Sequence, residues 1–117
     1  MTGFVDAGGT PVVVLPVAGQ DWRGVIDTGF NADLELPDAL RPHVNARFKG
    51  HLFSQLAAGQ QTMQPFFAVD FPFDGQVVSA EATFIPGNEI LLGTHMLHRY
   101  RLEIDFPAGT VVLTRVR

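Results

Sequence analysis

The sequence contains one Asp-Thr-Gly tripeptide, Asp27, Thr28 and Gly29, directly after the apolar residues Val25 and Ile26. An aspartate at the end of an apolar strand presents its carboxylate at the mouth of a buried element, where it can exchange protons with a bound water. Hydrolysis of a peptide bond by a water held on carboxylates needs two carboxylates that share one proton. Carboxylates about 3 Å apart cannot both ionise, so one of them keeps its proton. By itself, the tripeptide is equally compatible with a turn in which the aspartate caps its own backbone.

The second carboxylate has no evident source within this chain. None of the other aspartates, Asp70, Asp74 and Asp105 among them, is followed by Thr-Gly or Ser-Gly. We therefore expect the chain to act as a homodimer, in which a two-fold axis places Asp27 against its own copy.

Other residue types that could carry chemistry are less well placed. His95 and His98 are three residues apart, whereas His43 and His51 lie elsewhere in the sequence. No glutamate base lies between the paired histidines and no third ligand is evident, so we expect a solvated histidine face and no metal site.

Nucleophilic and phosphate chemistry also find little support. Ser54 and Thr62 are the hydroxyl residues to consider beside a histidine, but neither lies in a nucleophile elbow. The chain has no cysteine, which excludes thiolate catalysis and disulfides, and it has no glycine-rich phosphate loop. We expect no cofactor.

The composition is typical of an ordered globular protein, with 46% hydrophobic and 17% charged residues in a chain of 117. This length predicts a single domain spanning residues 1–117. The net charge is −4 and the eight Lys and Arg residues are scattered, so we expect neither a nucleic acid nor a membrane as partner. The N-terminus lacks the pattern of a signal peptide, and the longest apolar run, 11–18, is too short to span a bilayer. The expected location is the cytoplasm.

The elements that must position Asp27 are short strands separated by glycine and proline. Residues 12–17 and 22–26 predict a hairpin that runs into Asp27, and residues 34–36 predict a short strand. Residues 38–45 allow one helical turn, which Pro42 limits.

The second half of the chain continues this pattern. The segment 48–69 predicts a long hairpin with Ala57, Ala58, Gly59 and Gln60 at its tip. Further strands are expected over 76–85 and 90–92, and a closing hairpin over 102–106 and 110–116. Residues 94–100 predict a short helix with Thr94 as its N-cap. The fold class is therefore all-β with one short C-terminal helix.

The order of these elements resembles that of the retroviral-type aspartic proteases (retropepsins) and their bacterial single-domain relatives. The resemblance covers residues 12–115, and the run from Leu92 to Thr110 looks especially like the bacterial members. It implies a closed β-barrel and a homodimeric aspartic endopeptidase that binds an extended peptide or protein substrate.

The resemblance also implies roles for individual residues. Asp27 would be the catalytic residue, and Thr28 would bond across the two-fold axis. Gly29 would let the backbone approach the substrate. Leu91, Leu92 and Gly93 would support the active-site loop from below, and the 57–60 tip would form a flap that closes over the substrate.

Two positions depart from the retroviral pattern. Phe30 and Asn31 would line the substrate groove, but Phe30 stands where a small residue is usual. Asn31 and Thr94 replace an aspartate and an arginine, which suggests a neutral Asn31–Thr94 contact and a weaker dimer. Phe30 favours an alternative, a non-catalytic peptide-binding or dimerisation module on the same fold. A further alternative is an unrelated small β-barrel in which Asp27 only shapes a turn.

Overall fold

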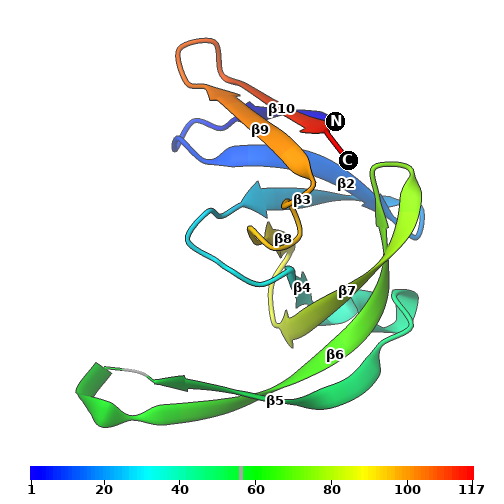
Figure 1. Ribbon diagram of the computed structural model, residues 1–117, viewed down its shortest axis with the longest axis vertical. Helices are drawn as coiled ribbons and strands as arrows, with labels where there is room; N and C mark the ends of the chain where they lie inside the picture. The colour runs from blue at the N-terminus through cyan, green and yellow to red at the C-terminus, as the bar shows by residue number, and fades with distance from the viewer. Residues whose placement is uncertain (56) are drawn as a thin grey trace.

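The computed structural model describes residues 1–55 and 57–117, and within them ten strands form one sheet in the order β5-β6-β7-β4-β8-β3-β2-β1-β10-β9 (Figure 1). Two short 3-10 helices, η1 (Asp38–His43) and η2 (Ala57–Gly59), interrupt the strands. The strands are β1 (Thr2–Val5), β2 (Pro11–Val17), β3 (Gln20–Ile26), β4 (Leu34–Pro37), β5 (Arg47–Gln55), β6 (Gln61–Phe73), β7 (Gln76–Ile85), β8 (Glu89–Leu92), β9 (Tyr100–Asp105) and β10 (Thr110–Arg115).

Most neighbouring strands are antiparallel, as expected for hairpins joined by tight turns. Two pairs are parallel, β3 with β8 and β4 with β7, and β8 lies between β3 and β4. In the β3–β8 pair, Ile26 is opposite Leu92. The C-terminal ends of these two strands therefore emerge side by side at one edge of the core, and the residues that follow them, Asp27 and Gly93, become neighbours.

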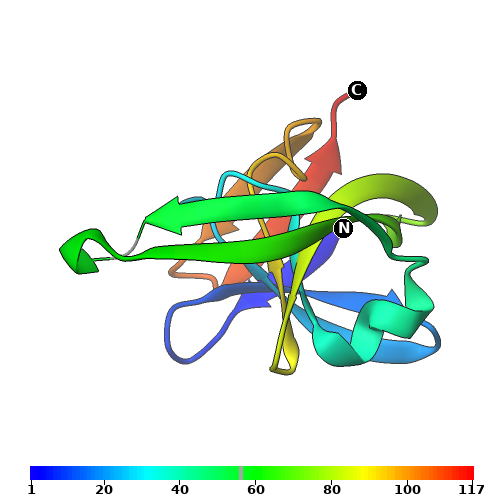
Figure 2. The same cartoon turned by 90° about the horizontal axis from the view of Figure 1, so that it is seen from below.

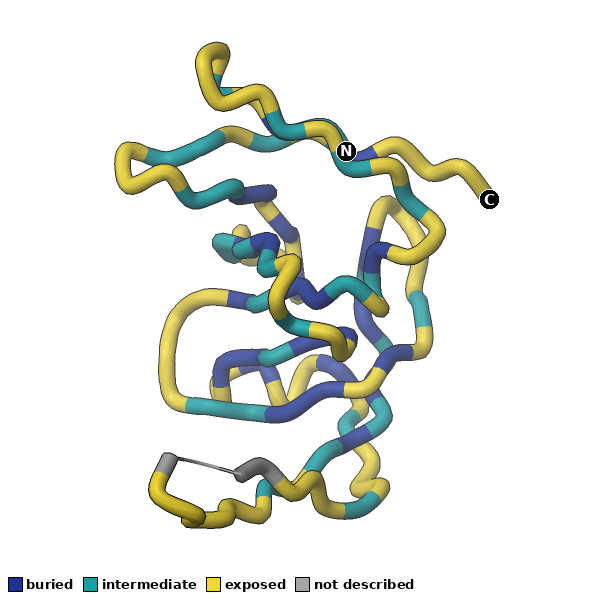
Figure 3. Tube along the Cα trace, turned by 60° about the vertical axis from the view of Figure 1, so that its left-hand side comes forward, coloured by how far each residue is buried: buried dark blue, intermediate teal, exposed yellow. Residues whose placement is uncertain are grey.

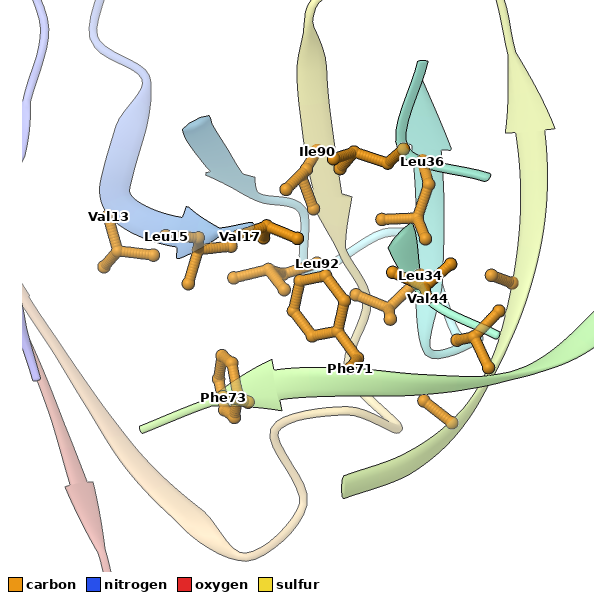
Figure 4. Close-up of a cluster of buried hydrophobic side chains, with 14 of the residues drawn as sticks. Val13, Leu15, Val17, Leu34, Leu36, Val44, Phe71, Phe73, Ile90 and Leu92 are labelled. Atoms are coloured by element: carbon orange, nitrogen blue, oxygen red, sulfur yellow. The ribbon is translucent and has the colours of Figure 1, made fainter. Parts of the chain in front are cut away.

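A continuous hydrophobic core holds these strand ends in place (Figure 4). Phe71, Leu34, Ile90 and Leu92 are almost fully excluded from solvent. In Figure 4, Phe71 points from β6 toward Leu92 and Leu34, so one aromatic ring packs against β8 and against β4, the strand that follows the Asp27 loop. Because Phe71 belongs to the hairpin strand β6, the core also fixes the base of that hairpin.

The β5–β6 hairpin extends well beyond the rest of the protein (Figures 1 and 2). Its base is anchored by aromatic contacts. The Phe67 ring lies 5.4 Å from that of Phe84 and 6.0 Å from that of Phe48, and the Arg41 guanidinium lies 4.3 Å from the Phe67 centroid. Toward its tip the hairpin is exposed, as the yellow segment in Figure 3 shows. The hairpin is therefore anchored to the core at its base and exposed to solvent in its outer part.

The tip of the hairpin has the strained backbone expected of a tight reversal. Gly59 has φ +75° and Ala58 has φ +65°. A left-handed conformation is easily adopted by glycine and disfavoured for residues with a Cβ. Gly59 therefore matches the sequence-based expectation of a glycine at the tip.

Most predicted strands are confirmed, including those that flank Asp27. The helical turn expected over 38–45 is the 3-10 helix η1, with Pro42 inside it. Strand β1 was not predicted from the sequence. Gly3 in β1 has no side chain in the way of the next strand, since a Cβ there would lie 1.9 Å from the Val12 carbonyl oxygen. β1 therefore packs closely between β2 and β10.

Two parts of the predicted fold class are wrong. The sheet does not close into a barrel, because β5 and β9 remain as its two edges. The helix expected over 94–100 is a series of hydrogen-bonded turns, in which the N–H groups of Leu97 and Tyr100 donate to the carbonyls three residues earlier. An α-helix would need the Arg99 N–H on the His95 carbonyl, but the His98 imidazole Nδ1 contacts that oxygen at 2.6 Å. Among the described residues, no helix is long and apolar enough to cross a lipid bilayer.

The position of Phe71 makes it a test of how the core supports the site. We predict that Phe71→Ala lowers the free energy of unfolding by about 3–5 kcal/mol, because it removes a buried ring and leaves a cavity. Val77 in β7 is 73% exposed, and Val77→Ala should change stability by no more than about 0.5 kcal/mol. Urea unfolding of both variants measures the difference. Equal effects would contradict the packing described for Phe71.

Candidate active site

The parallel β3–β8 pair determines where Asp27 lies. The Asp27 N–H donates to the Leu92 carbonyl at 3.0 Å, so the β3–β8 pairing continues into the first residue of the loop. The Asp27 side chain is half-buried, while Thr28 and Gly29 are exposed. The sequence-based expectation that Asp27 lies at the mouth of a buried strand agrees with this placement.

The loop that follows Asp27 is a tight turn closed by Asp27 itself. One carboxylate oxygen, Oδ1, accepts the Gly29 N–H at 2.9 Å, and the Asp27 carbonyl accepts the Phe30 N–H at 3.1 Å. This is an Asx turn, and it fixes the orientation of the carboxylate. Among the described residues no group donates a hydrogen bond to Oδ2, so that oxygen is available to a water or a reacting group.

Gly93 is the position that allows the loop to reach β8. A Cβ placed on Gly93 would lie 1.9 Å from the Ala32 carbonyl oxygen and 2.8 Å from the Phe30 carbonyl oxygen. Only glycine permits this close approach of two backbones. The Gly93 N–H donates to the Asp33 carbonyl at 2.9 Å, which closes the loop from the other side.

Asn31 and Thr94 join the loop to the turns that follow β8. The Thr94 hydroxyl donates to the Asn31 side-chain oxygen at 3.3 Å, and the Thr94 N–H donates to the Phe30 carbonyl at 2.8 Å. The neutral contact predicted from the joint replacement of these two positions is therefore present. Thr94 thus links the two segments through both its side chain and its backbone.

A second link, between Asp33 and His95, was missed by the sequence analysis. The Asp33 carboxylate is buried, with Oδ1 2.5 Å from the His95 Nδ1 and Oδ2 accepting the Glu81 N–H at 2.9 Å. The hydrogen bond with Asp33 and its negative charge raise the pKa of His95 above its ordinary value. The imidazolium therefore compensates a buried carboxylate at the end of the Asp27 loop.

A pocket of about 280 Å³ lies beside the Asp27 loop and the Asp33–His95 pair. We call it the loop pocket. Its walls combine Phe30 and Leu34 from the loop side with Leu52 and Phe66 from the β5–β6 hairpin, and the Asp33–His95 pair borders it. An apolar pocket with a few polar groups at its border is the usual form of a binding site for an organic ligand or a side chain.

The structure brings together only part of the predicted site. Phe30 and Asn31 line the loop pocket, and Leu91, Leu92 and Gly93 lie on and after β8 beneath the loop. Ala58, Gly59 and Gln60 are exposed at the hairpin tip and do not line the pocket. The side chain of Ala57, also predicted for the flap, lies outside the described part of the structure. Instead, Leu52 and Phe66, lower on the same hairpin, face it.

The missed residues carried only weak sequence signals. Asp33 is a single polar residue before an apolar strand, and His95 was assigned to a solvated face. Their contact joins residues 62 positions apart in the sequence, which no local pattern reveals. Among the described residues, no three His, Asp or Glu side chains lie close enough together to hold a metal ion.

Comparisons with known proteins identify the architecture. No protein-family model matches the sequence, and no curated protein matches it. Among solved structures, a retropepsin-like aspartic protease from Rickettsia conorii is similar with a TM-score of 0.66 and 16% identity, over 97% of this chain and 88% of that one. The simian foamy virus protease is similar with a TM-score of 0.59 and 20% identity, over 74% of this chain and 91% of that one. The chain has a retropepsin-like fold.

The close approach at Gly93 gives a direct test of the loop geometry. We predict that Gly93→Ala lowers the free energy of unfolding by at least about 2 kcal/mol, because the new methyl group would overlap the Ala32 carbonyl. Gly8→Ala is the matched control, since a Cβ at Gly8 meets its nearest atom at 3.5 Å. Chemical unfolding of both variants measures the effect. A Gly93→Ala protein as stable as the Gly8→Ala protein would contradict this loop geometry.

The Asp33–His95 pair predicts a pH dependence of stability. The folded-state pKa of His95 is raised, so its stabilising contribution is fully present below the unfolded value of about 6.5 and is lost as pH rises through the raised value. We expect His95→Gln to destabilise the protein more at about pH 6 than at about pH 8.5. The exposed His43 gives the control, since His43→Gln should leave the pH dependence of the parent in place. Urea unfolding of both variants and the parent across this pH range measures the effect. An equal loss of stability at both pH values in the His95→Gln protein would contradict the prediction.

Proposed function

We propose that this chain is one subunit of a homodimeric aspartic endopeptidase, with Asp27 as its catalytic residue. The retropepsin-like fold and the two aspartic proteases among its structural neighbours support assignment to the hydrolases. In this proposal the active site lies on the two-fold axis of the dimer and takes one Asp27 from each subunit. It needs no metal and no organic cofactor.

The observation that carries the proposal is the state of the Asp27 carboxylate. It is held at the end of β3 by its own turn, with Oδ1 accepting the Gly29 N–H at 2.9 Å. Oδ2 is left free within the described part of the chain, and an apolar pocket begins at Phe30. A fixed carboxylate with one free oxygen beside a side-chain pocket is the half-site that a shared-proton mechanism requires.

The chemistry then follows from pairing two such carboxylates. Asp27 and the partner subunit's Asp27 hold one water molecule and one proton between them. The ionised carboxylate takes a proton from the water as its oxygen bonds to the peptide carbonyl carbon, while the protonated carboxylate donates to the carbonyl oxygen. The tetrahedral intermediate collapses when the C–N bond breaks, and the leaving nitrogen receives the proton that the base had taken.

The β5–β6 hairpin supplies the upper wall of the proposed substrate groove. An extended peptide between the hairpin and the Asp27 loop would form backbone hydrogen bonds, with alternate side chains entering pockets on either side. Leu52 and Phe66 make the loop pocket suited to an apolar side chain. The exposed tip at Gly59 would close over the bound peptide and exclude water.

The subunit contacts of this proposal are largely neutral. The exposed Thr28 hydroxyl would bond across the axis to the partner's loop. Asn31 and Thr94 satisfy each other within one chain at 3.3 Å, so no ion pair at this position strengthens the assembly. We expect a dimer that forms readily only at high protein concentration.

Phe30 supports a second candidate, a peptide-binding module without catalysis. Phe30 lines the loop pocket, so its ring takes up space there that a small residue would leave open. Such a module would bind peptides in the same groove, but it would not bring a scissile bond within reach of the carboxylates.

We predict that the purified protein cleaves a mixed peptide library at mildly acid pH and that Asp27→Asn abolishes cleavage. Asparagine keeps an oxygen that can accept the Gly29 N–H, so the turn and the fold should persist, but the amide cannot take a proton from water. Mass spectrometry of the library detects the products, and circular dichroism checks the fold. Full activity in the Asp27→Asn protein would contradict the assignment of Asp27 as the catalytic residue.

The same library distinguishes the second candidate. Peptides that bind to both proteins and remain uncut at every pH would favour the module without catalysis. Sedimentation of both proteins over a range of concentrations measures the dimer directly. A protein that cleaves peptides as a strict monomer would contradict the paired-aspartate site.

A further inference from the structure

A second pocket, about 270 Å³ in volume, lies on the other side of the Asp33–His95 pair. We call it the arginine-rimmed pocket. Its walls come from β6, β7, the turns that follow β8, the first residue of β9, and β10, and they include Phe73, Val78, Met96, Arg99, Tyr100 and Arg115. Asp33 and His95 line both pockets, whereas Arg99 and Arg115 line only this one.

The walls of this pocket gather positive charge in an otherwise acidic chain. The whole sequence has eight Lys and Arg residues, four His and a net charge of −4. Two of these eight cationic residues, Arg99 and Arg115, line this one pocket, beside His95 and His98. Its only lining carboxylate is Asp33, which His95 and the Glu81 N–H already satisfy.

Two hydrogen bonds hold the Arg115 guanidinium in place. Its Nε donates to the main-chain oxygen of Arg117 at 2.7 Å and its Nη1 donates to the Gln76 side-chain oxygen at 3.2 Å. A guanidinium group has five N–H donors, so donors remain after these two bonds. Among the described residues no Asp or Glu side chain forms an ion pair with Arg115.

Arg99 adds a second cation at the same rim. Its backbone carbonyl accepts the Val116 N–H at 3.0 Å, which ties the turn that carries it to the end of β10. Within the part of the chain that the structure describes, the Arg99 side chain has no carboxylate within ion-pair distance. Arg99, on the turns that follow β8, and Arg115, on β10, thus both line this pocket.

The floor between the two arginines is apolar. The Phe73 ring is buried and meets the Tyr100 ring edge-on, with centroids 5.4 Å apart. The Tyr100 hydroxyl donates to Asp74 at 3.0 Å, so the neighbouring carboxylate of Asp74 is also occupied. Burial and this hydrogen bond raise the pKa of Tyr100, which keeps the phenol neutral.

We propose that the arginine-rimmed pocket binds an organic carboxylate carried on an aromatic or aliphatic body. The apolar floor would receive the body, and Arg99 and Arg115 would hold the carboxylate through charge-assisted hydrogen bonds. The volume suits a ligand of the size of one amino acid. The carboxylate can belong to a free organic acid or to the C-terminal residue of a peptide. The site is distinct from the loop pocket and does not depend on proteolysis by Asp27.

The test compares a carboxylate ligand with the uncharged amide of the same molecule. N-acetyl-phenylalanine and N-acetyl-phenylalanine amide share the same body and differ in the carboxylate. Titration of the ¹⁵N-labelled full chain followed by NMR should give saturable shifts at Arg99, Tyr100 and Arg115 with the acid. We expect a dissociation constant of about a millimolar or tighter for the acid and at least about tenfold weaker binding of the amide.

Variants locate the binding at the two arginines. Arg99→Gln and Arg115→Gln should each weaken binding of the acid by about tenfold or more, and Arg115→Lys should restore part of the loss. Lys49→Gln removes one positive charge from exposed strand β5 and is the matched control, with affinity expected within about twofold of the parent. Both arginines are exposed, so the variants should fold as the parent does.

The results distinguish the two sources of the carboxylate and show whether the proposal holds. Comparable binding of phenylacetate would identify free acids as ligands, whereas binding of N-acetyl-phenylalanine alone would identify a peptide C-terminus. Equal affinity for acid and amide would overturn the proposal. So would a lack of effect of both arginine substitutions, or the absence of saturable shifts at concentrations about tenfold higher than expected.

Discussion

The candidate site depends on the close approach of two backbones at Gly93. The carbonyl of Ala32 occupies the space where any other residue would place its Cβ, at 1.9 Å. This contact is possible because β3 and β8 run parallel with Ile26 opposite Leu92, so both strands end at the same level. The turn at Asp27, the pocket that begins at Phe30 and the contacts of Thr94 all follow from it. A parallel pair of short strands thus sets the geometry of the whole loop.

Around this contact, the loop is held by three kinds of interaction with different sensitivity to conditions. Backbone hydrogen bonds from Asp27, Gly93 and Thr94 are independent of pH. The Asn31–Thr94 contact is neutral and therefore insensitive to salt as well. The Asp33–His95 pair brings two titratable groups together, and it joins the base of the loop to the turns that follow β8. Because this pair also separates the two pockets, it is the one place where a change in protonation or in ligand would reach both.

The two edges of the open sheet differ: one carries the protruding β5–β6 hairpin and the other the charged edge strand β9. Packing of Phe71 and the aromatic contacts of Phe67 fix the base of the β5–β6 hairpin, while the outer part extends into solvent (Figures 1 and 2). At the other edge of the sheet, Arg101 and Glu103 form an ion pair on the edge strand β9. Charged side chains of this kind discourage pairing with further strands.

The sequence by itself determined the strand order around Asp27, the hairpin with Gly59 at its tip and the neutral Asn31–Thr94 contact. The strands and the hairpin rest on local patterns: alternating apolar residues, turn residues, and a tripeptide after a buried strand. The Asn31–Thr94 contact follows from the resemblance to the retroviral proteases. The sequence failed over 94–100, where Thr94 as an N-cap predicted a helix. There the Leu97 and Tyr100 N–H groups bond to carbonyls three residues earlier instead of four. It also missed Asp33 with His95 and the gathering of Arg99 with Arg115. Only the tertiary structure decided these, because each depends on segments that are distant in sequence meeting across β8 and β10, and no local pattern encodes such a meeting.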